Sequence, residues 1–259
     1  MPKIIILGSS NALPSQESEN THMVFVGLER MVLVDAPGGN LILRLEQAGL
    51  DFNNLTDIIV THFHPDHTLG IPSLLMDMWL LKRTRPINIY GLPDTLDRVE
   101  TLMDLYNWSD WPDFFPVLFH RLSVDEMSPV LDCFDFTIHA SPVHHVIPNI
   151  GLRIQFKQPN RTIAYSCDTE PCDEVVRLSA GADILIHEAA GEFIGHSSAK
   201  QAGEIARKAE VGSLYLIHYA TGKYAEGDLI AEARTTFPGD ITLAKDFMTL
   251  DFSSKNARN

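Results

Sequence analysis

The chain has few cysteines and no long apolar run, and both absences narrow its class. Only three cysteines occur among 259 residues, and no two of them form a C-x-x-C pair. This excludes a disulfide framework and a zinc ribbon, and it favours reduced thiols in a cytoplasmic protein. No apolar stretch is long enough to span a bilayer, and MPKIIILGSS at the N-terminus lacks the apolar region and cleavage site of a signal peptide. We therefore expect a cytoplasmic protein with no membrane partner.

Basic residues are also scarce. Lys and Arg number 20 against 34 Asp and Glu, which gives a formal net charge of −14. Such an excess repels a polyanion except at a locally charged site, so a general nucleic-acid coat protein is excluded. No repeat, low-complexity tract or Gly/Ser linker interrupts the chain, and 45% of its residues are hydrophobic. We expect a single domain over residues 1–259 with a substantial core.

Short apolar runs bounded by turn residues predict strands in both halves of the chain. They cover residues 3–7, 23–28, 31–35, 57–61 and 87–90, then 134–139, 151–156, 162–166, 184–186 and 214–217. Helices are expected at 41–48, 72–82, 93–106, 171–180 and 199–209. Pro72 and Pro93 suit the first helical position, and Ser198 with Gln201 has the form of a capping box. Strands in both halves with helices outside them predict sheets packed face to face and covered by helices.

Histidines are abundant, and four potential metal ligands fall within the segment HFHPDH, which follows one of the predicted buried strands. Pro65 disfavours helical geometry at His64, so His62 and His64 continue an extended segment while Asp66 and His67 follow the bend. Two ligands can then face one ion and two another. Imidazole and carboxylate groups on loops are the usual ligands of divalent transition metals. The segment therefore predicts a metal centre.

Such a centre needs further ligands from distant segments. His145, Asp168 and His218 each follow a strand-like run, which brings the candidates to seven. Seven donors are enough for two ions that share one carboxylate.

These segments resemble the metallo-β-lactamase superfamily, and within it the ribonuclease Z branch, which cleaves precursor tRNA at its 3′ side. The resemblance covers nearly the whole chain, through LGSSNALPS, HFHPDH, PVHHVIPNIGLRI, YSCDTEPCDEVVRLSAGADILIHEAAG and GHSSAKQAGEIARKAEVGSLYLIHYATGKY. It implies an α/β fold of four layers, the αββα sandwich. It also implies two divalent ions, zinc by expectation and Mn²⁺ or Fe²⁺ as alternatives, because the same donors accept all three.

The resemblance implies a role for each candidate ligand. One ion would be held by His62, His64 and His145, the other by Asp66, His67 and His218, and Asp168 would bridge them. His144 is an alternative to His145, but the step to Gly151 matches the family from His145 only. Asp35, which ends a predicted strand, is expected to orient a ligand.

Glu188 and His196 match a family pair thought to handle protons and the leaving group. His196 also lies just before a capped helix, where the helix dipole and free amides favour an anion such as phosphate. Glu188 is expected to orient this imidazole and raise its pKa. The predicted catalytic residues are thus Asp66, His196 and Glu188, of which Asp66 would orient or deprotonate the nucleophile. Without the resemblance, His196 could also be an ordinary loop residue.

Two departures from ribonuclease Z bear on the substrate. That family inserts a tRNA-clamping arm between the ligands matching His145 and Asp168, which here are only 23 residues apart. The family's H-[FY]-S-x-R-Y is His218-Tyr-Ala-Thr-Gly-Lys-Tyr224 in this chain. We therefore expect a metal-dependent phosphodiesterase acting on a small phosphodiester, such as a cyclic nucleotide or a phosphonate-pathway cyclic phosphate. A ribonuclease Z that processes tRNA 3′ ends is the alternative.

Other functions within the superfamily are also compatible with this sequence. Some superfamily members reduce dioxygen at a di-iron site, and some retain the metal without useful turnover. A homodimer is the default expectation for a soluble enzyme. The aromatic segment around Trp108 and Trp111 suits either a lid or a dimer contact, and the basic run at 82–85 is expected to cap the helix before it.

Overall fold

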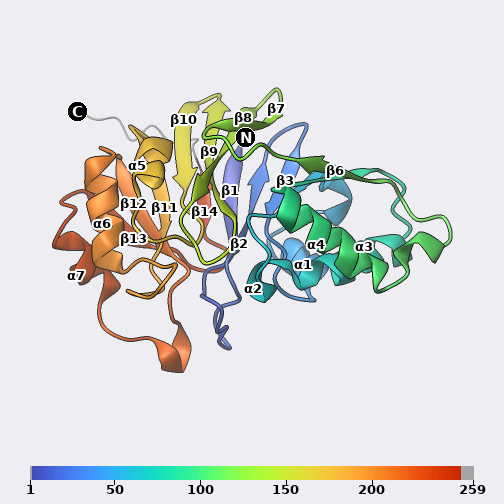
Figure 1. Ribbon diagram of the computed structural model, residues 1–259, viewed down its shortest axis with the longest axis horizontal. Coiled ribbons are helices and arrows are strands. Elements are labelled where there is room, and N and C mark those ends of the chain that lie inside the picture. Colours follow the sequence, from blue (N-terminus) through green and yellow to red (C-terminus); the bar gives the residue numbers. More distant parts are fainter. Residues whose placement is uncertain (1, 252–259) are drawn as a thin grey trace.

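Two β-sheets packed face to face form the centre of the structure, and helices cover their outer faces (Figure 1). The coordinates are a computed structural model that describes residues 2–251. Across the first sheet, the strands lie in the order β14 (Thr249–Asp251), β1 (Lys3–Gly8), β2 (His22–Val26), β3 (Met31–Val34), β4 (Asp57–Ile59), β5 (Ile87–Gly91) and β6 (Val117–Arg121). The second sheet has the order β13 (Asp240–Leu243), β12 (Ser213–Ile217), β11 (Ile184–Glu188), β10 (Asn160–Tyr165), β9 (Asn149–Lys157), β8 (Phe136–Val143) and β7 (Ser128–Asp132).

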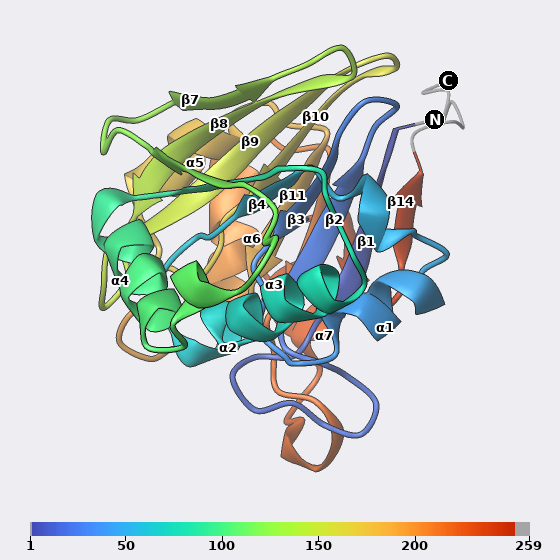
Figure 2. The same ribbon diagram turned by 90° about the vertical axis from the view of Figure 1, so that its right-hand side faces the viewer.

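Each sheet has its own set of helices. The first is covered by α1 (Leu41–Gln47), α3 (Gly70–Leu80) and α4 (Pro93–Asp104), with the short α2 (Pro65–Thr68) at its edge (Figure 2). The second is covered by α5 (Asp173–Ser179), α6 (Ala199–Lys208) and α7 (Leu229–Arg234). Single 3-10 turns lie at Phe52–Asn54, Trp108–Asp110 and Gly222–Tyr224. The predicted four-layer αββα sandwich is confirmed.

Apolar side chains fill three spaces between the four layers. The central core joins the inner faces of both sheets, with Phe25 of β2 and Phe136 of β8 among its buried members. A second core lies between the first sheet and α1, α3 and α4, and a third between the second sheet and α5, α6 and α7. Burial on both faces explains why β3 and residues 58–60 of the β4 segment are continuous apolar runs. Among the described residues, no helix combines the length and apolarity needed to cross a membrane.

The strands that carry the predicted ligands end at one edge of the molecule. β3 and β4 are parallel, as are β10, β11 and β12. Parallel strands end at the same sheet edge, so the loops after β3, β4, β10 and β12 converge there. The loop between β1 and β2 (blue) and the loop after β12 (orange) project together from this edge in both views (Figures 1 and 2).

Two local expectations differ from the structure. Helix α3 begins at Gly70, so Pro72 is its third residue, because α2 and α3 follow each other almost without a break. The guanidinium of Arg83 does not cap α3: it is buried and donates to the carbonyls of Phe52 and Leu55. The last carbonyls of α3 are satisfied instead by backbone amides of residues 81–83.

The aromatic segment packs onto the helices of the first sheet. Trp79 of α3 stacks on Trp111 with ring centroids 5.2 Å apart and donates its indole N–H to the carbonyl of Pro112. Trp108 donates to Asp104 at the end of α4. All three indoles contact the outer core, and they do not line the cavity described below.

The capping box before α6 is present as predicted and is open to a stability test. The Ser198 hydroxyl accepts from Gln201 N at 3.3 Å, and Ser198 N donates to the Gln201 side chain at 2.8 Å. We expect Ser198→Ala to lower the free energy of unfolding by about 1 kcal/mol in urea denaturation. Lys200→Ala, an exposed change in the same helix, is the control and should change it by less than about 0.5 kcal/mol. Equal effects of the two substitutions would contradict the role of the cap.

Candidate metal centre

The segment after β4 folds as its proline predicts. His64 is extended, with φ −97° and ψ 154°, and α2 starts at Pro65, so Asp66 and His67 lie in the first turn of that helix. The backbone of His67 is fixed by its carbonyl, which accepts from Ala36 N at 2.8 Å. The strand end and the helix turn therefore present two pairs of donors from only six residues.

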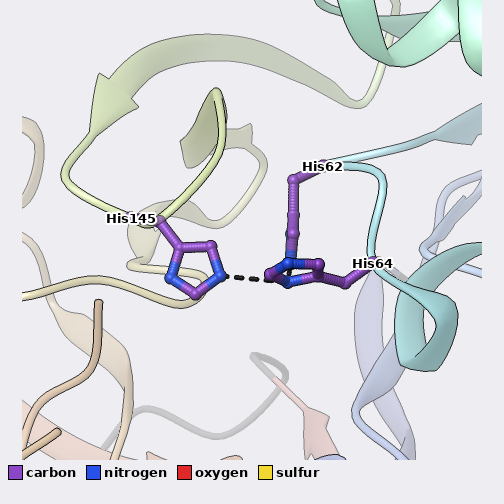
Figure 3. A group of neighbouring side chains, drawn as sticks. All are labelled: His62, His64 and His145. Carbon is purple, nitrogen blue, oxygen red and sulfur yellow. Dashed lines mark hydrogen bonds between the residues drawn. The ribbon is translucent and has the colours of Figure 1, made fainter. Parts of the chain in front are cut away.

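Three imidazoles converge as the first group. His62 Nε2 lies 3.0 Å from His64 Nδ1, and His145 Nε2 lies 3.1 Å from the same atom. Figure 3 shows His145 approaching from the loop after β8, opposite the two histidines of the β4 loop. On its far side, His145 Nδ1 donates to the carbonyl of Gly195 at 2.7 Å, which turns Nε2 toward the other two rings.

The second group surrounds the carboxylate of Asp168. Its Oδ2 lies 3.2 Å from His218 Nε2, 3.4 Å from His67 Nε2 and 3.9 Å from His62 Nε2. Asp66 Oδ2 lies 3.4 Å from His67 Nε2. Asp168 thus contacts residues of both groups, which is the position that a shared carboxylate requires. All seven residues named from the sequence come together here.

Hydrogen bonds behind the centre orient its imidazoles. Asp35 is fully buried; its carboxylate accepts from His67 Nδ1 at 2.8 Å and from the amide and hydroxyl of Thr61. The Thr61 hydroxyl also lies 3.1 Å from His62 Nδ1, so it links Asp35 to a second imidazole. Thr61 is not among the residues predicted from the sequence, although its position directly before His62 is a signal for this role.

Four further histidines lie outside the centre. His144 is 62% exposed and turns away toward Glu174, 3.4 Å distant. His22 and His187 are buried and bond to backbone carbonyls, and His120 bonds to the side chain of Asn88. None of the four belongs to the two convergent groups around Asp168 and His64.

Burial and charge shift the pKa values of the cluster in opposite directions. Burial holds the pKa of His62 well below its usual value and lowers that of His218 to about 4, so these imidazoles are neutral, as metal ligands must be. Burial alone would lower the pKa of His67 as well, but the carboxylates of Asp168 and Asp35 raise it well above its usual value. Asp168 is ionised, because His218 and His67 outweigh its burial and keep its pKa well below the usual range.

The donor set fits a pair of divalent ions. His67 Nε2 and Asp168 Oδ1 are buried and find no hydrogen-bond partner among residues 2–251. Buried polar atoms are normally satisfied, so unpaired atoms within a cluster of imidazoles and carboxylates point to a cation as the missing partner. Nitrogen and carboxylate oxygen donors suit zinc, manganese or iron.

Three residues at the centre adopt left-handed backbone conformations. Asp35, Cys167 and His218 have φ of 62°, 53° and 53°, each just after a strand of the parallel region. A non-glycine residue pays roughly 1 kcal/mol or more for this conformation, so it persists only where the surroundings impose it. The backbone is thus bent sharply where ligands and their partners leave the sheets.

Glu188 and His196 form a hydrogen-bonded pair beside the second group. His196 Nδ1 donates to Glu188 Oε1 at 3.0 Å, and Glu188 is fully buried at the end of β11. Burial raises the pKa of Glu188 to about 7. Against the effect of its own burial, the hydrogen bond and charge of Glu188 raise the pKa of His196. The pair therefore retains a proton near neutral pH, and the Nε2 atom of His196 is left for a substrate.

The two groups and His196 open into one cavity of about 320 Å³. Its lining residues are Asn11, Ala12, His64, Asp66, Asp168, Ala190, Phe193, His196 and His218. A second cavity of about 580 Å³ lies between the β1–β2 loop and the loop after β12, where Glu17 and Lys223 face it. Cavities of this size accommodate small organic ligands.

Comparison with known proteins decides the family. The model of a β-lactamase superfamily domain matches residues 30–219, which span every predicted ligand. The chain belongs to this superfamily. Together with the cluster of imidazoles and carboxylates, this membership identifies a metal-dependent hydrolase.

This superfamily member is similar over nearly its whole length to proteins of the ribonuclease Z branch. It is 28% identical to ribonuclease Z of Methanothermobacter thermautotrophicus, with 97% of each chain covered. The alignment has 309 positions although this chain has 259 residues, so the relative carries segments that this chain lacks.

Solved structures show the same fold. The metallo-β-lactamase fold protein YhfI from Bacillus subtilis superposes with a TM-score of 0.79 at 23% identity, covering 96% of this chain and 98% of that one. The short form of human tRNase Z gives 0.78 at 25% identity, covering 97% and 100%. The resemblance to a ribonuclease Z-like hydrolase of the metallo-β-lactamase type is therefore confirmed.

The convergence of seven donors predicts how much metal the protein binds. The protein purified without chelator should contain close to two divalent ions per chain by elemental analysis, because seven donors converge. His64→Ala should lose metal and hydrolytic activity together. His144→Ala changes the neighbouring sequence position outside the cluster and should keep both ions. Trace metal only in the wild-type protein would contradict the prediction.

Proposed function

We propose that this hydrolase cleaves a small phosphodiester, linear or cyclic, with two zinc ions held by the seven residues above. The structure supports this through the chain segment between His145 and Asp168. That segment forms β9 and β10, two antiparallel strands joined by a tight turn at Gln158 and Pro159. No arm leaves the molecule there to hold a distant part of a folded RNA.

The charge around the cavities also favours a small substrate. A tRNA carries many phosphates, and each one that a protein neutralises requires a nearby cation. At the cavity beside the centre, Lys223 is opposed by Glu17 on the facing loop. Arg83, in the one compact basic run, is buried against backbone carbonyls. A single diester needs far fewer cations than an RNA elbow.

The proposed roles follow from position. The ions would supply an activated water and stabilise negative charge on the oxygens of the diester. Asp66 lines the cavity with part of its carboxylate exposed, so it can orient the attacking water and accept its proton. His196, protonated through its bond to Glu188, donates a proton to the departing oxygen. Glu188 is a positioning residue, since its carboxylate is also held by the amides of Thr169 and Ala190.

Ribonuclease Z activity is the second candidate. The curated relative described above carries that name and is similar over 97% of this chain. A homodimer would offer one route to it, because a second subunit can supply a clamp that this chain lacks. The two candidates share the same chemistry at phosphorus and differ in how the rest of the substrate is held.

The role of His196 gives a kinetic prediction. His196→Ala should keep both ions and lower turnover of an unactivated diester by about 10²–10⁴, the usual worth of a positioned acid. With nitrophenolate as leaving group the loss should shrink, because that oxygen needs less protonation. His120→Ala is the control, because this histidine contacts Asn88 and Tyr90 in the first sheet and lies outside the cluster. A loss below about threefold on the unactivated substrate would remove His196 from the mechanism.

Substrate size gives a separate prediction. Cyclic or aryl diesters should be hydrolysed at least as well per enzyme as a precursor tRNA, and with weak dependence on ionic strength, because few phosphates are contacted. Both substrates would be compared at several salt concentrations. The opposite result would be accurate removal of a tRNA 3′ trailer at low enzyme concentration, with activity that falls steeply as the salt concentration rises. That result would establish ribonuclease Z activity instead.

A further inference from the structure

One large apolar side chain lines the cavity beside the candidate metal centre. Phe193 lines the cavity together with His64, Asp168 and His196, yet 68% of its surface is exposed. Ile194, the next residue in the chain, and Val146, which lies beside Gly195, are 83% and 54% exposed. Exposed apolar area of this kind is unfavourable in water and commonly marks a binding surface.

The loop that carries Phe193 is held in place. The backbone amide of Phe193 donates to Gly191 O and its carbonyl accepts from His196 N, both at 3.0 Å. Gly195 is fixed on both sides, because its amide donates to Glu170 at 2.8 Å and its carbonyl accepts from His145. The loop is therefore tied to a predicted metal ligand, and the backbone position of Phe193 relative to the centre is fixed with it.

The phenyl ring itself is supported from one side. It lies against Gly191, whose φ of +127° is a glycine conformation, and a Cβ there would come within 2.5 Å of Cε2 of Phe193. The absence of a side chain at Gly191 thus leaves room for the ring to pack on the loop backbone. The remaining exposed area of the ring is open to a ligand.

We propose that Phe193 is a stacking platform for a planar aromatic group of the substrate, namely a nucleobase. The cavity then divides by chemistry: the polar side receives the phosphodiester, and the apolar rim receives the base. Aromatic side chains bind bases through their π-faces with little dependence on base identity. Phe193 precedes His196 by three residues on the same loop, which places the base on the leaving-group side. This assignment rests on the proposed function and narrows it to nucleotide-containing diesters.

Binding of two product-like phosphates tests the platform without requiring turnover. Adenosine 5′-monophosphate and ribose 5-phosphate share a phosphate and a sugar and differ by the base. Titration calorimetry on the metal-containing protein as purified should show about tenfold tighter binding of the nucleotide, the worth of one stacked base. Phe193→Leu keeps an apolar side chain without a ring and should lose most of this ratio at unchanged affinity for ribose 5-phosphate. Phe193→Tyr keeps the ring and should retain the ratio.

The chain offers a matched control. Phe134 is also 68% exposed, but it precedes β8, whose opposite end leads to His145. Phe134→Leu should leave both affinities unchanged. The proposal is overturned if the wild-type protein binds the two phosphates equally or binds neither. It is also overturned if Phe193→Leu keeps the ratio or weakens both ligands alike. Preferential nucleotide binding without hydrolysis of any diester would contradict the proposed function but support the role of Phe193 as a stacking platform.

Discussion

A single buried carboxylate holds the arrangement of the site together. Asp168 leaves the second sheet and lies within 4 Å of imidazoles from both sheets, His62 and His67 on one side and His218 on the other. A negative charge removed from water is costly unless positive or polar partners surround it. Three features meet this requirement where the two sheets join. They are the surrounding histidines, the bent backbone at Cys167 and the carboxylate of Asp35 behind His67.

The inner strands of both sheets were predicted from the sequence, whereas the strands at the sheet edges were missed. Strands buried on both faces were identified from their short apolar runs, residues 58–60 in and after β4 and residues 184–186 in β11. The four strands that were missed, β6, β7, β13 and β14, are the four edge strands of the two sheets. Edge strands face solvent and mix polar with apolar residues; β6, for example, has no buried residue, so neither alternation nor a continuous apolar run marks it.

The candidate site was predictable for a related reason. Its ligands directly follow apolar strands in the sequence, and the carboxyl ends of parallel strands meet, so distant residues were brought together by topology alone. Residues that act through backbone or through exposure gave no such signal. Gly195 contributes its carbonyl to His145 from a backbone with φ of +82°, and a Cβ there would come within 2.8 Å of His145 Nδ1, but a lone glycine in a loop gives no sign of this contact. An exposed Phe193 likewise resembles an ordinary loop residue until the cavity beside it is known.

The placement of the ligands across both sheets has a consequence for the stability and the cellular abundance of the protein. His62, His64, Asp66 and His67 belong to the first half of the chain, and His145, Asp168 and His218 to the second. Ions bound at the seam would cross-link the halves, so the folded state would be stabilised in proportion to the logarithm of the free metal concentration. The metal-free chain would keep its three apolar cores but leave buried polar atoms, such as His67 Nε2 and Asp168 Oδ1, without hydrogen-bond partners at the junction of the sheets. Local opening at that junction exposes backbone to proteases, and the abundance of such a protein would then follow the supply of metal.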